Sequence, residues 1–207
     1  MRKISDIYNV SRETFSKLEV YHSSLLEWQN KFNLVSKNSL DDAWNRHFVD
    51  SIQLVEYIPD DAKSLIDMGS GAGFPGMVLA ILLNERTPYL KVTLVESITK
   101  KTLYLNHVKE TASVKVEIIN GRVEQIKNRK FDVVTSRAMT SLIDLLDYAY
   151  PFLNKKGGCV FPKGKSWNEE VNIAKNKWNF NFEVFDSKTS EEGKIILIHN
   201  LVLRGTK

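Results

Sequence analysis

The chain contains 207 residues, of which 43% are hydrophobic and 26% are charged, a balance typical of a folded globular protein. This length suits one domain with a modest extension. The longest apolar run, 77–83, is far shorter than a membrane span, and charged residues interrupt the N-terminal region where a secretory signal would be apolar. The single cysteine, Cys159, excludes an internal disulfide and a multi-cysteine metal site. We therefore expect a cytoplasmic protein without a membrane anchor, and a monomer by default.

The net charge of +4 conceals a basic segment in the middle of the chain. Residues 85–130 contain ten Lys or Arg and five Glu, a net charge of +5, whereas the rest of the chain sums to −1. Lysine and arginine side chains that neutralise phosphates release condensed counterions, so a basic segment indicates a polyanionic partner such as nucleic acid. A few excess charges also serve solubility, so charge alone leaves the partner open.

The first part of the chain is predicted to be helical. Apolar residues recur at three- and four-residue spacing, which predicts a helix over 3–36 with one apolar face. A second helix is predicted over 41–57, ending before Pro59. The apolar face of the first helix consists of Leu18, Tyr21, Leu25, Trp28 and Phe32.

From residue 64 onward, short apolar strands alternate with helices. This alternation predicts parallel crossover units and a doubly wound sheet. The last two strands have no helix between them and are predicted to form an antiparallel hairpin. The predicted strands are 64–69, 91–97, 114–120, 131–137, 158–163, 180–185 and 194–203, and the predicted helices are 76–86, 99–112, 141–150 and 167–177.

The strongest chemical signal is the glycine-rich segment 66–76, which leaves the first strand and opens the next helix. Glycine lets the backbone turn sharply and approach a ligand closely, and the helix N-terminus offers free N–H groups. The pattern Gly71-x-Gly73-x-x-Gly76 fits a dinucleotide fingerprint. The pattern Gly69-x-Gly71-x-Gly73 instead fits the loop that binds S-adenosylmethionine (SAM). Both cofactors stay open at this point.

Glu96 is predicted to end the second strand, where a carboxylate can accept the ribose hydroxyls of an adenosine. Because SAM and NAD both carry this ribose, Glu96 does not distinguish them. Arg137 follows the fourth strand, at the carboxyl edge where ligands bind in such sheets. We expect Cys159, within an apolar strand, to be a buried residue rather than a nucleophile.

If the cofactor is SAM, the sequence also restricts which atoms can accept the methyl group. The Asn/Asp-Pro-Pro-Tyr element that methyltransferases use for exocyclic amino groups is absent near Arg137, and cytosine C5 transfer needs a nucleophilic cysteine. What remains is a nucleophile that already has a lone pair, such as a ring nitrogen. Guanine N7 is one, and its attack needs no general base.

Several motifs in order resemble the RsmG (GidB) family of 16S rRNA guanine-N7 methyltransferases. Residues 28–34 (W-Q-N-K-F-N-L) resemble its W-N-K-x-F-N-L element, although Gln29 replaces the usual Asn. Residues 46–51 (R-H-F-V-D-S) match its R-H-x-x-D-S element, and 67–76 resemble its D-x-G-S-G-x-G-x-P-G loop. The later matches, in the family's order, are Glu96-Ser97 with Lys100-Lys101, Arg122-Val123-Glu124, Ser136-Arg137-Ala138 and Lys163-Gly164.

This resemblance implies a Rossmann-like, SAM-dependent methyltransferase fold: an α/β, seven-stranded sheet with a C-terminal antiparallel hairpin behind a helical N-terminal extension. The expected domains are 1–60 for the extension and 61–207 for the methyltransferase. It also implies methyl transfer from SAM to N7 of a guanine in the 530 loop (conventional position 527) of 16S rRNA, within the small ribosomal subunit. The implied SAM-binding residues are Gly69, Gly71, Gly73, Phe74, Glu96, Val123, Glu124 and Arg137, where Val123 stands in place of the common Ala.

Arg137 is the residue expected to position the reactants, with no general base. Arginine often bridges O6 and N7 of guanine, but a contact at N7 would block the attacking lone pair. We therefore predict that Arg137 touches the cofactor or O6 only. The basic residues expected to position RNA phosphates are Lys100, Lys101, Arg122 and Lys163.

Other polar and aromatic residues are given structural roles. His47 is expected to pack or hydrogen-bond between the extension and the sheet near Asp50, while Asp50 is an alternative partner for Arg46 on the same helix face. The four tryptophans are expected in the core rather than as base-stacking platforms. No metal site is expected from the four scattered histidines.

Two other functions compete with the methyltransferase. An NAD-dependent oxidoreductase would need further crossover units and a proton-transfer residue. A non-catalytic ribosome-assembly factor could hold SAM as a structural ligand, and it would bind SAM without producing S-adenosylhomocysteine.

Overall fold

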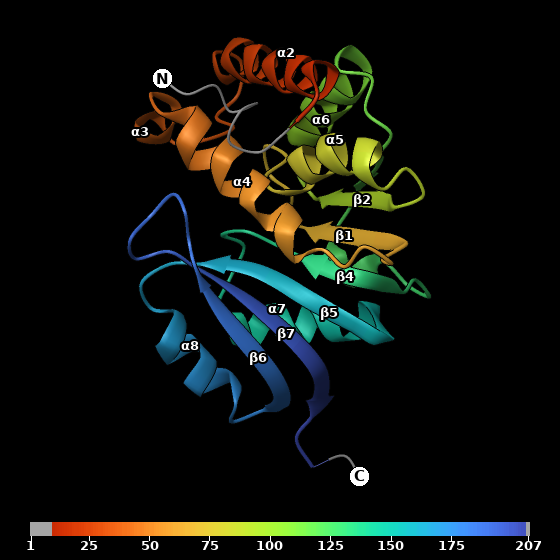
Figure 1. Ribbon diagram of the computed structural model, residues 1–207, viewed down its shortest axis with the longest axis vertical. Coiled ribbons are helices and arrows are strands. Elements are labelled where there is room, and N and C mark those ends of the chain that lie inside the picture. The colour runs from red at the N-terminus through yellow and green to blue at the C-terminus, as the bar shows by residue number, and fades with distance from the viewer. Residues whose placement is uncertain (1–9, 206–207) are drawn as a thin grey trace.

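The computed structural model describes residues 10–205, which form one seven-stranded sheet covered by helices on both faces (Figure 1). The strand order is β3-β2-β1-β4-β5-β7-β6. The first five strands pair in parallel, whereas β7 is antiparallel to both β5 and β6. The strands are β1 (Ser64–Met68), β2 (Lys91–Glu96), β3 (Glu117–Asn120), β4 (Phe131–Thr135), β5 (Leu153–Lys163), β6 (Trp178–Asp186) and β7 (Lys194–Leu203).

The helices follow the predicted alternation from β1 onward. The sheet helices are α5 (Gly76–Arg86), α6 (Thr99–Thr111), α7 (Leu142–Ala149) and α8 (Trp167–Ala174), with short helical turns η3 (Val123–Gln125) and η4 (Tyr150–Phe152). The extension contains α2 (Arg12–Gln29), α3 (Lys37–Leu40), the π-helical turn η1 (Trp44–Val49), α4 (Asp50–Ile52) and the 3-10 turn η2 (Gln53–Tyr57). The predicted parallel units and the C-terminal antiparallel hairpin are thus confirmed.

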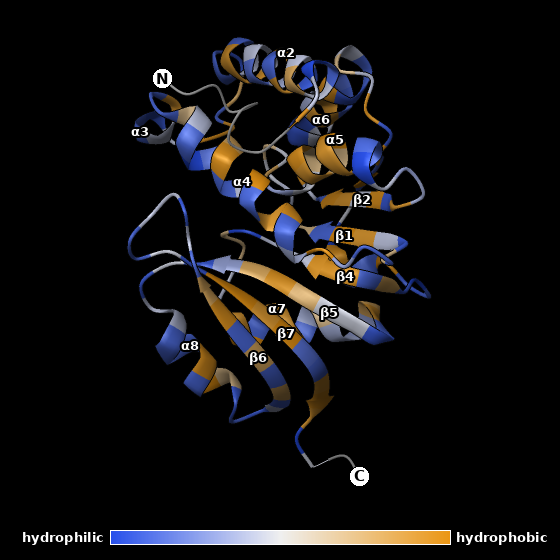
Figure 2. Ribbon diagram, in the orientation of Figure 1, coloured by the Kyte–Doolittle hydropathy of each residue, from blue (hydrophilic) through white to orange (hydrophobic). Residues whose placement is uncertain are grey.

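Alternate residues of the strands supply two apolar clusters, one on each face of the sheet. Leu65 belongs to the cluster that also contains residues of α2, α5 and α6, whereas its neighbour Ile66 belongs to the cluster with residues of α7 and α8. Strands buried on both faces are mainly apolar, as the mostly orange colour of β1, β2 and β4 shows in Figure 2. Helix α5 is buried from Gly76 to Leu83, which explains why it lacks a polar face.

The first helix is shorter than predicted. It begins after Ser11, whose hydroxyl accepts a hydrogen bond from the Thr14 N–H (3.1 Å), and it ends at Gln29. The Gln29 side-chain oxygen accepts hydrogen bonds from the N–H groups of Leu34 and Val35, at 3.0 Å each. These contacts hold a turn where the apolar spacing predicted more helix. The predicted continuation of the first helix over 30–36 was therefore wrong. The predicted residues 3–9 lie outside the described part of the chain.

The extension packs directly on the sheet. Leu18, Tyr21 and Leu25 are fully buried in the same apolar cluster as Leu65 and Met77. The proposed boundary near residue 60 falls in the turn between η2 and β1, and the division into two domains stays a prediction. Within residues 10–205, no helix is long and apolar enough to cross a membrane.

Candidate functional site

The glycine-rich loop between β1 and α5 follows a path that side chains would obstruct. Gly69, Gly71 and Gly73 have φ values of 67°, 59° and 99°, in the region that favours glycine. Gly73 is further constrained by the extension, because a Cβ atom there would lie 2.5 Å from Tyr21 Oη. The same hydroxyl donates a hydrogen bond to the Ala72 carbonyl at 2.6 Å. Helix α2 therefore fixes the loop from above.

Asp67 supports the loop from below. Its side chain is fully buried at the end of β1, and Oδ2 accepts a hydrogen bond from the Gly76 N–H at 3.1 Å. A Cβ atom at Gly76 would lie 2.5 Å from this oxygen, so the close approach requires glycine. Burial raises the pKa of Asp67 to about 7. Oδ1 of Asp67 has no hydrogen-bond partner within residues 10–205.

Glu96 connects the loop to the neighbouring strand. It lies at the end of β2 with 5% exposure, and its Oε2 accepts a hydrogen bond from the Gly71 N–H at 2.8 Å. Its Oε1 accepts one from the Ile98 N–H at 2.7 Å. Because each carboxylate oxygen has two lone pairs, both oxygens can also accept a ligand hydroxyl. The arrangement fits the predicted contact with an adenosine ribose.

The segment containing Val123 and Glu124 lies beside Glu96. The Gly121 N–H donates to the Glu96 carbonyl at 3.0 Å, and turn η3 follows directly. Val123 is buried in the cluster that contains Met68 and Val95, whereas Glu124 is exposed. The glycine loop, Glu96 and η3 thus meet at the carboxyl ends of β1, β2 and β3, as the sequence predicted.

The Phe74 side chain is packed inside the protein and does not offer an open surface to a ligand. Its side chain is 4% exposed, and its ring stacks on Tyr21 (centroids 5.2 Å apart) and His47 (5.0 Å). A cofactor contact at Phe74 would therefore use its backbone. The ring also lies 5.1 Å from the Arg137 guanidinium carbon, a cation–π contact that connects the loop with the next site residue.

Arg137 is held by the extension. Its Nη1 donates hydrogen bonds to the Arg46 carbonyl and to Asp50 Oδ2, both at 3.1 Å, and Nη2 lies 2.9 Å from His47 Nδ1. The guanidinium has five N–H donors, so these contacts leave two for a ligand. All three partners come from η1 and the start of α4. They are the Arg, His and Asp of the R-H-x-x-D pattern at residues 46–50, so this spacing places all three around one guanidinium. Asp50 pairs with Arg137, so the alternative pairing with Arg46 was wrong.

His47 is a neutral acceptor in this arrangement. A guanidinium can only donate, so Nδ1 must accept and the ring proton lies on Nε2. Burial and the nearby charges of Arg137 and Arg46 lower the pKa of His47 to about 4. Nε2 is buried, without a hydrogen-bond partner within the described residues. The expected position of His47, between extension and sheet near Asp50, is confirmed.

Asp50 also contacts the loop between β6 and β7. Its Oδ1 accepts hydrogen bonds from Thr189 Oγ1 at 2.7 Å and from Gln53 Nε2 at 3.0 Å. Gln53 in turn accepts one from the Lys188 N–H at 2.8 Å. A polar chain therefore joins three segments that are far apart in the sequence: the end of β4, the extension and the β6–β7 loop.

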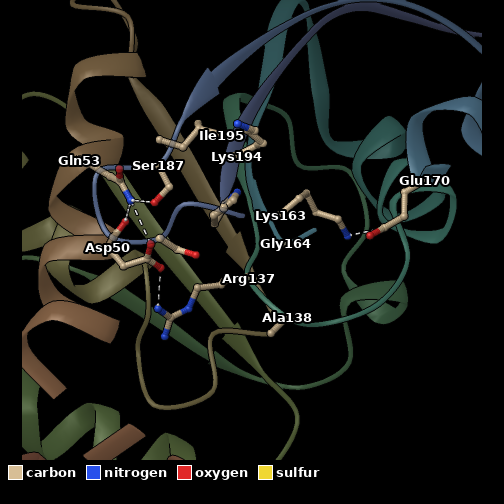
Figure 3. A pocket seen from close by; sticks show the side chains of 13 residues that line it. Asp50, Gln53, Arg137, Ala138, Lys163, Gly164, Glu170, Ser187, Lys194 and Ile195 are labelled. Carbon is tan, nitrogen blue, oxygen red and sulfur yellow. Dashed lines mark hydrogen bonds and ion pairs between the residues drawn. The ribbon is translucent and has the colours of Figure 1, made fainter. Parts of the chain in front are cut away.

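A cavity of about 300 Å³ opens beside Arg137 (Figure 3). It lies between the ends of β4 and β5 and under the β6–β7 loop. Asp50 and Arg137 line one side, and Lys163 and Glu170 line the other, as Figure 3 shows. Sequence reasoning missed Asp50 as the partner of Arg137, and it missed Glu170 altogether, because neither pairing has a local sequence signal.

The four residues predicted to contact phosphates lie in three places: the start of α6, the turn before η3 and the end of β5. Lys100 is exposed at the start of α6, with Nζ 5.4 Å from the Phe32 ring centroid, and Lys101 follows it half-buried. Arg122 is exposed immediately before η3. Lys163 instead forms an ion pair of 2.6 Å with Glu170, and its side chain is only 10% exposed. Contact with phosphate stays a prediction for all four.

Cys159 and the four tryptophans lie where the sequence predicted them. Cys159 is buried, and burial raises the pKa of its thiol above its usual range, so it is not a nucleophile. Trp178 is 4% exposed, and Trp28, Trp44 and Trp167 pack against the two clusters. Within residues 10–205, no group of three or more His, Cys, Asp or Glu side chains could hold a metal ion.

Two solved methyltransferases have the same fold. A SAM-dependent methyltransferase from Aquifex aeolicus superposes with a TM-score of 0.60 at 12% identity, covering 80% of this chain and 96% of that one. An O-methyltransferase from Bacillus cereus in complex with SAH superposes with a TM-score of 0.59 at 13% identity, covering 95% of both chains. At such identities the likeness concerns the fold alone, and the predicted Rossmann-like methyltransferase fold is confirmed.

Sequence relatives cover nearly the whole chain. The family model GidB, described as rRNA small subunit methyltransferase G, matches residues 14–196. The protein "Ribosomal RNA small subunit methyltransferase G" from Rhodospirillum rubrum is 41% identical over 189 residues, covering 91% of this chain and 92% of that protein. The protein of the same name from Hyphomonas neptunium is 39% identical over 196 residues, covering 95% and 92%. The chain therefore belongs to the rRNA small subunit methyltransferase G (GidB) family.

Proposed function

We propose that this chain transfers the methyl group of SAM to N7 of one guanine in the 530 loop of 16S rRNA. The supporting observation is the preformed cradle at the end of β1, where the Gly71 N–H is hydrogen-bonded to Glu96 at 2.8 Å. Space in front of Gly71 is open, because the nearest atom to a Cβ built there is 3.9 Å away. The glycine backbone and the carboxylate fit the amino acid and ribose portions of SAM. The small ribosomal subunit is the proposed partner, which places the reaction in the cytoplasm.

When bound, SAM would supply a methyl group on a positively charged sulfur. The N7 lone pair would form a bond to the methyl carbon in line with the carbon–sulfur bond that breaks, S-adenosylhomocysteine would leave, and no proton would have to be removed. The site residues suit a reaction of this kind. His47 is neutral at physiological pH and already accepts a hydrogen bond from Arg137, so its Nδ1 is not available as a base. Alignment of the reactants, rather than proton transfer, is the task left to the protein.

Arg137 and Asp50 perform that alignment in our proposal. Asp50 neutralises the charge of Arg137, so the guanidinium does not set an uncompensated positive charge against a reaction that moves positive charge onto the guanine ring. Three hydrogen bonds and the Phe74 ring fix the guanidinium plane, so its remaining donors have a defined direction. A base that is paired or stacked in RNA must be exposed before it can reach this site.

The proposal is tested with small ribosomal subunits from cells that lack this methylation. The subunits are incubated with methyl-labelled SAM, and N7-methylguanine is located by chemical cleavage. We expect label at one guanine of the 530 loop and one equivalent of S-adenosylhomocysteine per methyl group. Label at another nucleotide would contradict the proposed target, and SAM binding without label would support a non-catalytic assembly factor.

A further inference from the structure

The side of the cavity opposite Arg137 carries a charged pair to which the proposed function has assigned no role. Lys163 Nζ and Glu170 Oε2 are 2.6 Å apart, with side-chain exposures of 10% and 21%. Figure 3 shows the two side chains pointing at each other across from Arg137 and Asp50. A surface Lys–Glu pair contributes little and is mobile, but this pair is largely withdrawn from solvent.

Neighbouring backbone groups hold both members of the pair. The Leu142 N–H donates to Glu170 Oε2 at 2.7 Å, and Lys163 Nζ donates to the Thr140 carbonyl at 3.2 Å. Both contacts come from the segment that leads from β4 into α7. The hydrogen bond and ion pair to Glu170 fall on Oε2, and within residues 10–205 none falls on Oε1. An ammonium has three N–H groups, so Lys163 also has a donor left for a ligand.

Guanine presents a complementary pattern on its Watson–Crick edge: the O6 acceptor, then the N1–H donor, then the 2-amino donor. Enzymes that act on an extruded base read this edge by hydrogen bonds. We propose that Lys163 and Glu170 select the target guanine, with Lys163 Nζ donating to O6 and Glu170 Oε1 accepting from N1–H and the 2-amino group. This inference rests on the proposed function and names the base-reading residues of the same site. It gives the one remaining donor of Lys163 to the base in place of the phosphate contact predicted from the sequence.

The strand order gives the base a suitable orientation. The glycine loop follows β1, Arg137 follows β4 and Lys163 ends β5, and these three strands are neighbours in the sheet. In a purine, N7 and the N1–N2 edge lie on opposite sides of the ring system. A base over the ends of β4 and β5 can therefore direct N7 toward the glycine loop and its Watson–Crick edge toward Glu170. Pro162 and Ile195 supply apolar lining to the same cavity.

The pair would also reject adenine, which has an N7 atom of its own. Adenine would place its 6-amino group against the Lys163 ammonium and its bare N1 against the Glu170 carboxylate. A donor would then face a donor, and an acceptor an acceptor. A site whose buried polar groups are left unpaired by the wrong substrate discriminates strongly against it.

The test combines one substitution with one change in the RNA base. The kcat/KM of methylation is measured for wild-type protein and for Glu170→Gln. The substrates are small subunits reconstituted with 16S rRNA that carries guanine or inosine at the target position. Inosine keeps N7, O6 and N1–H but lacks the 2-amino group. We expect Glu170→Gln to lower kcat/KM on guanine by roughly 10- to 100-fold, the range for a paired base contact. Inosine should lower the wild-type value several-fold but leave the variant nearly unchanged. In Glu170→Gln the amide oxygen stays with its donors, the Leu142 N–H and Lys163, so the NH2 group faces the base and the contact with N1–H and the 2-amino group is already lost.

Two controls separate base reading from damage to the fold. SAM affinity, measured by calorimetry, should be the same for Glu170→Gln and wild type. Glu169→Gln, an exposed neighbour in the first turn of α8 that does not line the cavity, should behave as wild type. Equal inosine effects in wild type and Glu170→Gln, or wild-type kinetics in the variant, would overturn the inference and leave the proposed function standing. Failure of wild-type protein to methylate the guanine subunit would overturn both.

Discussion

The glycine-rich loop and the Arg137 site differ in how they are built. The loop is made by backbone conformation over eight consecutive positions, 69–76, with Asp67 two residues before it in β1. The Arg137 site is made by side chains from segments that are 87 and 139 residues apart along the chain, through Asp50 to Arg137 and Asp50 to Thr189. The two regions meet at Phe74, whose ring contacts both Tyr21 and Arg137.

This difference separates two kinds of function. A cofactor cradle common to many methyltransferases can be encoded locally, because it needs a strand end, glycines and a helix start. A site that orients a particular nucleophile needs groups fixed from several directions. Under the proposed function the helical extension supplies those groups in this chain, so the extension would take part in the chemistry as well as in the core.

The largest effect is expected in the loop, from Gly73→Ala. The new Cβ atom would lie 2.5 Å from Tyr21 Oη, and the residue would have to keep a φ of 99°. Overpacking and backbone strain together should lower the free energy of unfolding by about 2–5 kcal/mol and abolish SAM binding. Urea unfolding and calorimetry measure both quantities. Gly164→Ala, where no atom lies within 4 Å of the new Cβ, should unfold like wild type.

Arg137→Ala tests the other region. The variant loses three hydrogen bonds and the contact with Phe74, and we expect kcat/KM to fall by roughly 10²- to 10³-fold while the protein stays folded. Arg137→Lys should not restore activity, because an ammonium cannot reproduce the guanidinium fork. Arg86→Ala, which removes an exposed ion pair with Asp60, is the matched control. Activity near the wild-type level in Arg137→Lys would show that charge alone suffices.

Asp50→Asn isolates the contribution of the extension to that site. The amide keeps the size of the side chain but removes the charge that compensates Arg137, so we expect roughly a tenfold loss of kcat/KM. SAM affinity should change much less than turnover. An equal loss of SAM affinity and turnover would instead make Asp50 part of the cofactor site.

Asp67→Asn should alter the pH dependence of stability. Burial raises the pKa of Asp67 to about 7, from an unfolded value of 3.8. Between these pH values the Asp67 carboxyl is protonated in the folded chain and ionised in the unfolded chain, so a rising pH favours unfolding. The stability that this group contributes is therefore present below pH 3.8 and is lost as the pH rises to about 7. The difference in unfolding free energy between the variant and wild type should therefore rise over this range. A difference that does not vary with pH would contradict the raised pKa.

Tyr21→Phe should give the smallest effect. It removes only the hydroxyl that donates to the Ala72 carbonyl, a buried bond of 2.6 Å, and keeps the stacked ring. We expect a loss of about 1 kcal/mol in unfolding free energy and a few-fold loss of SAM affinity. No change in SAM affinity would show that the loop holds its path without the extension.

The same contrast explains what the sequence could predict. Strand positions, the glycine loop and Glu96 have local signals, so they were placed within a few residues. The end of α2 was missed because the Gln29 side chain, rather than the apolar spacing, decides where the helix stops. The partners of Arg137 and Lys163 were missed because hydrogen bonds between distant segments depend on the packed fold, which has no periodicity to read.

The most direct test of the account is made in cells. The chain, or its Arg137→Ala variant at equal protein level, is expressed in a bacterium that lacks its own enzyme for this methylation, and N7-methylguanine in the 530 loop is measured. We predict full methylation at one guanine with the wild-type chain and none above background with Arg137→Ala. Methylation by the variant, or none by the wild-type chain, would contradict an active site assembled from the glycine loop and the Arg137 site.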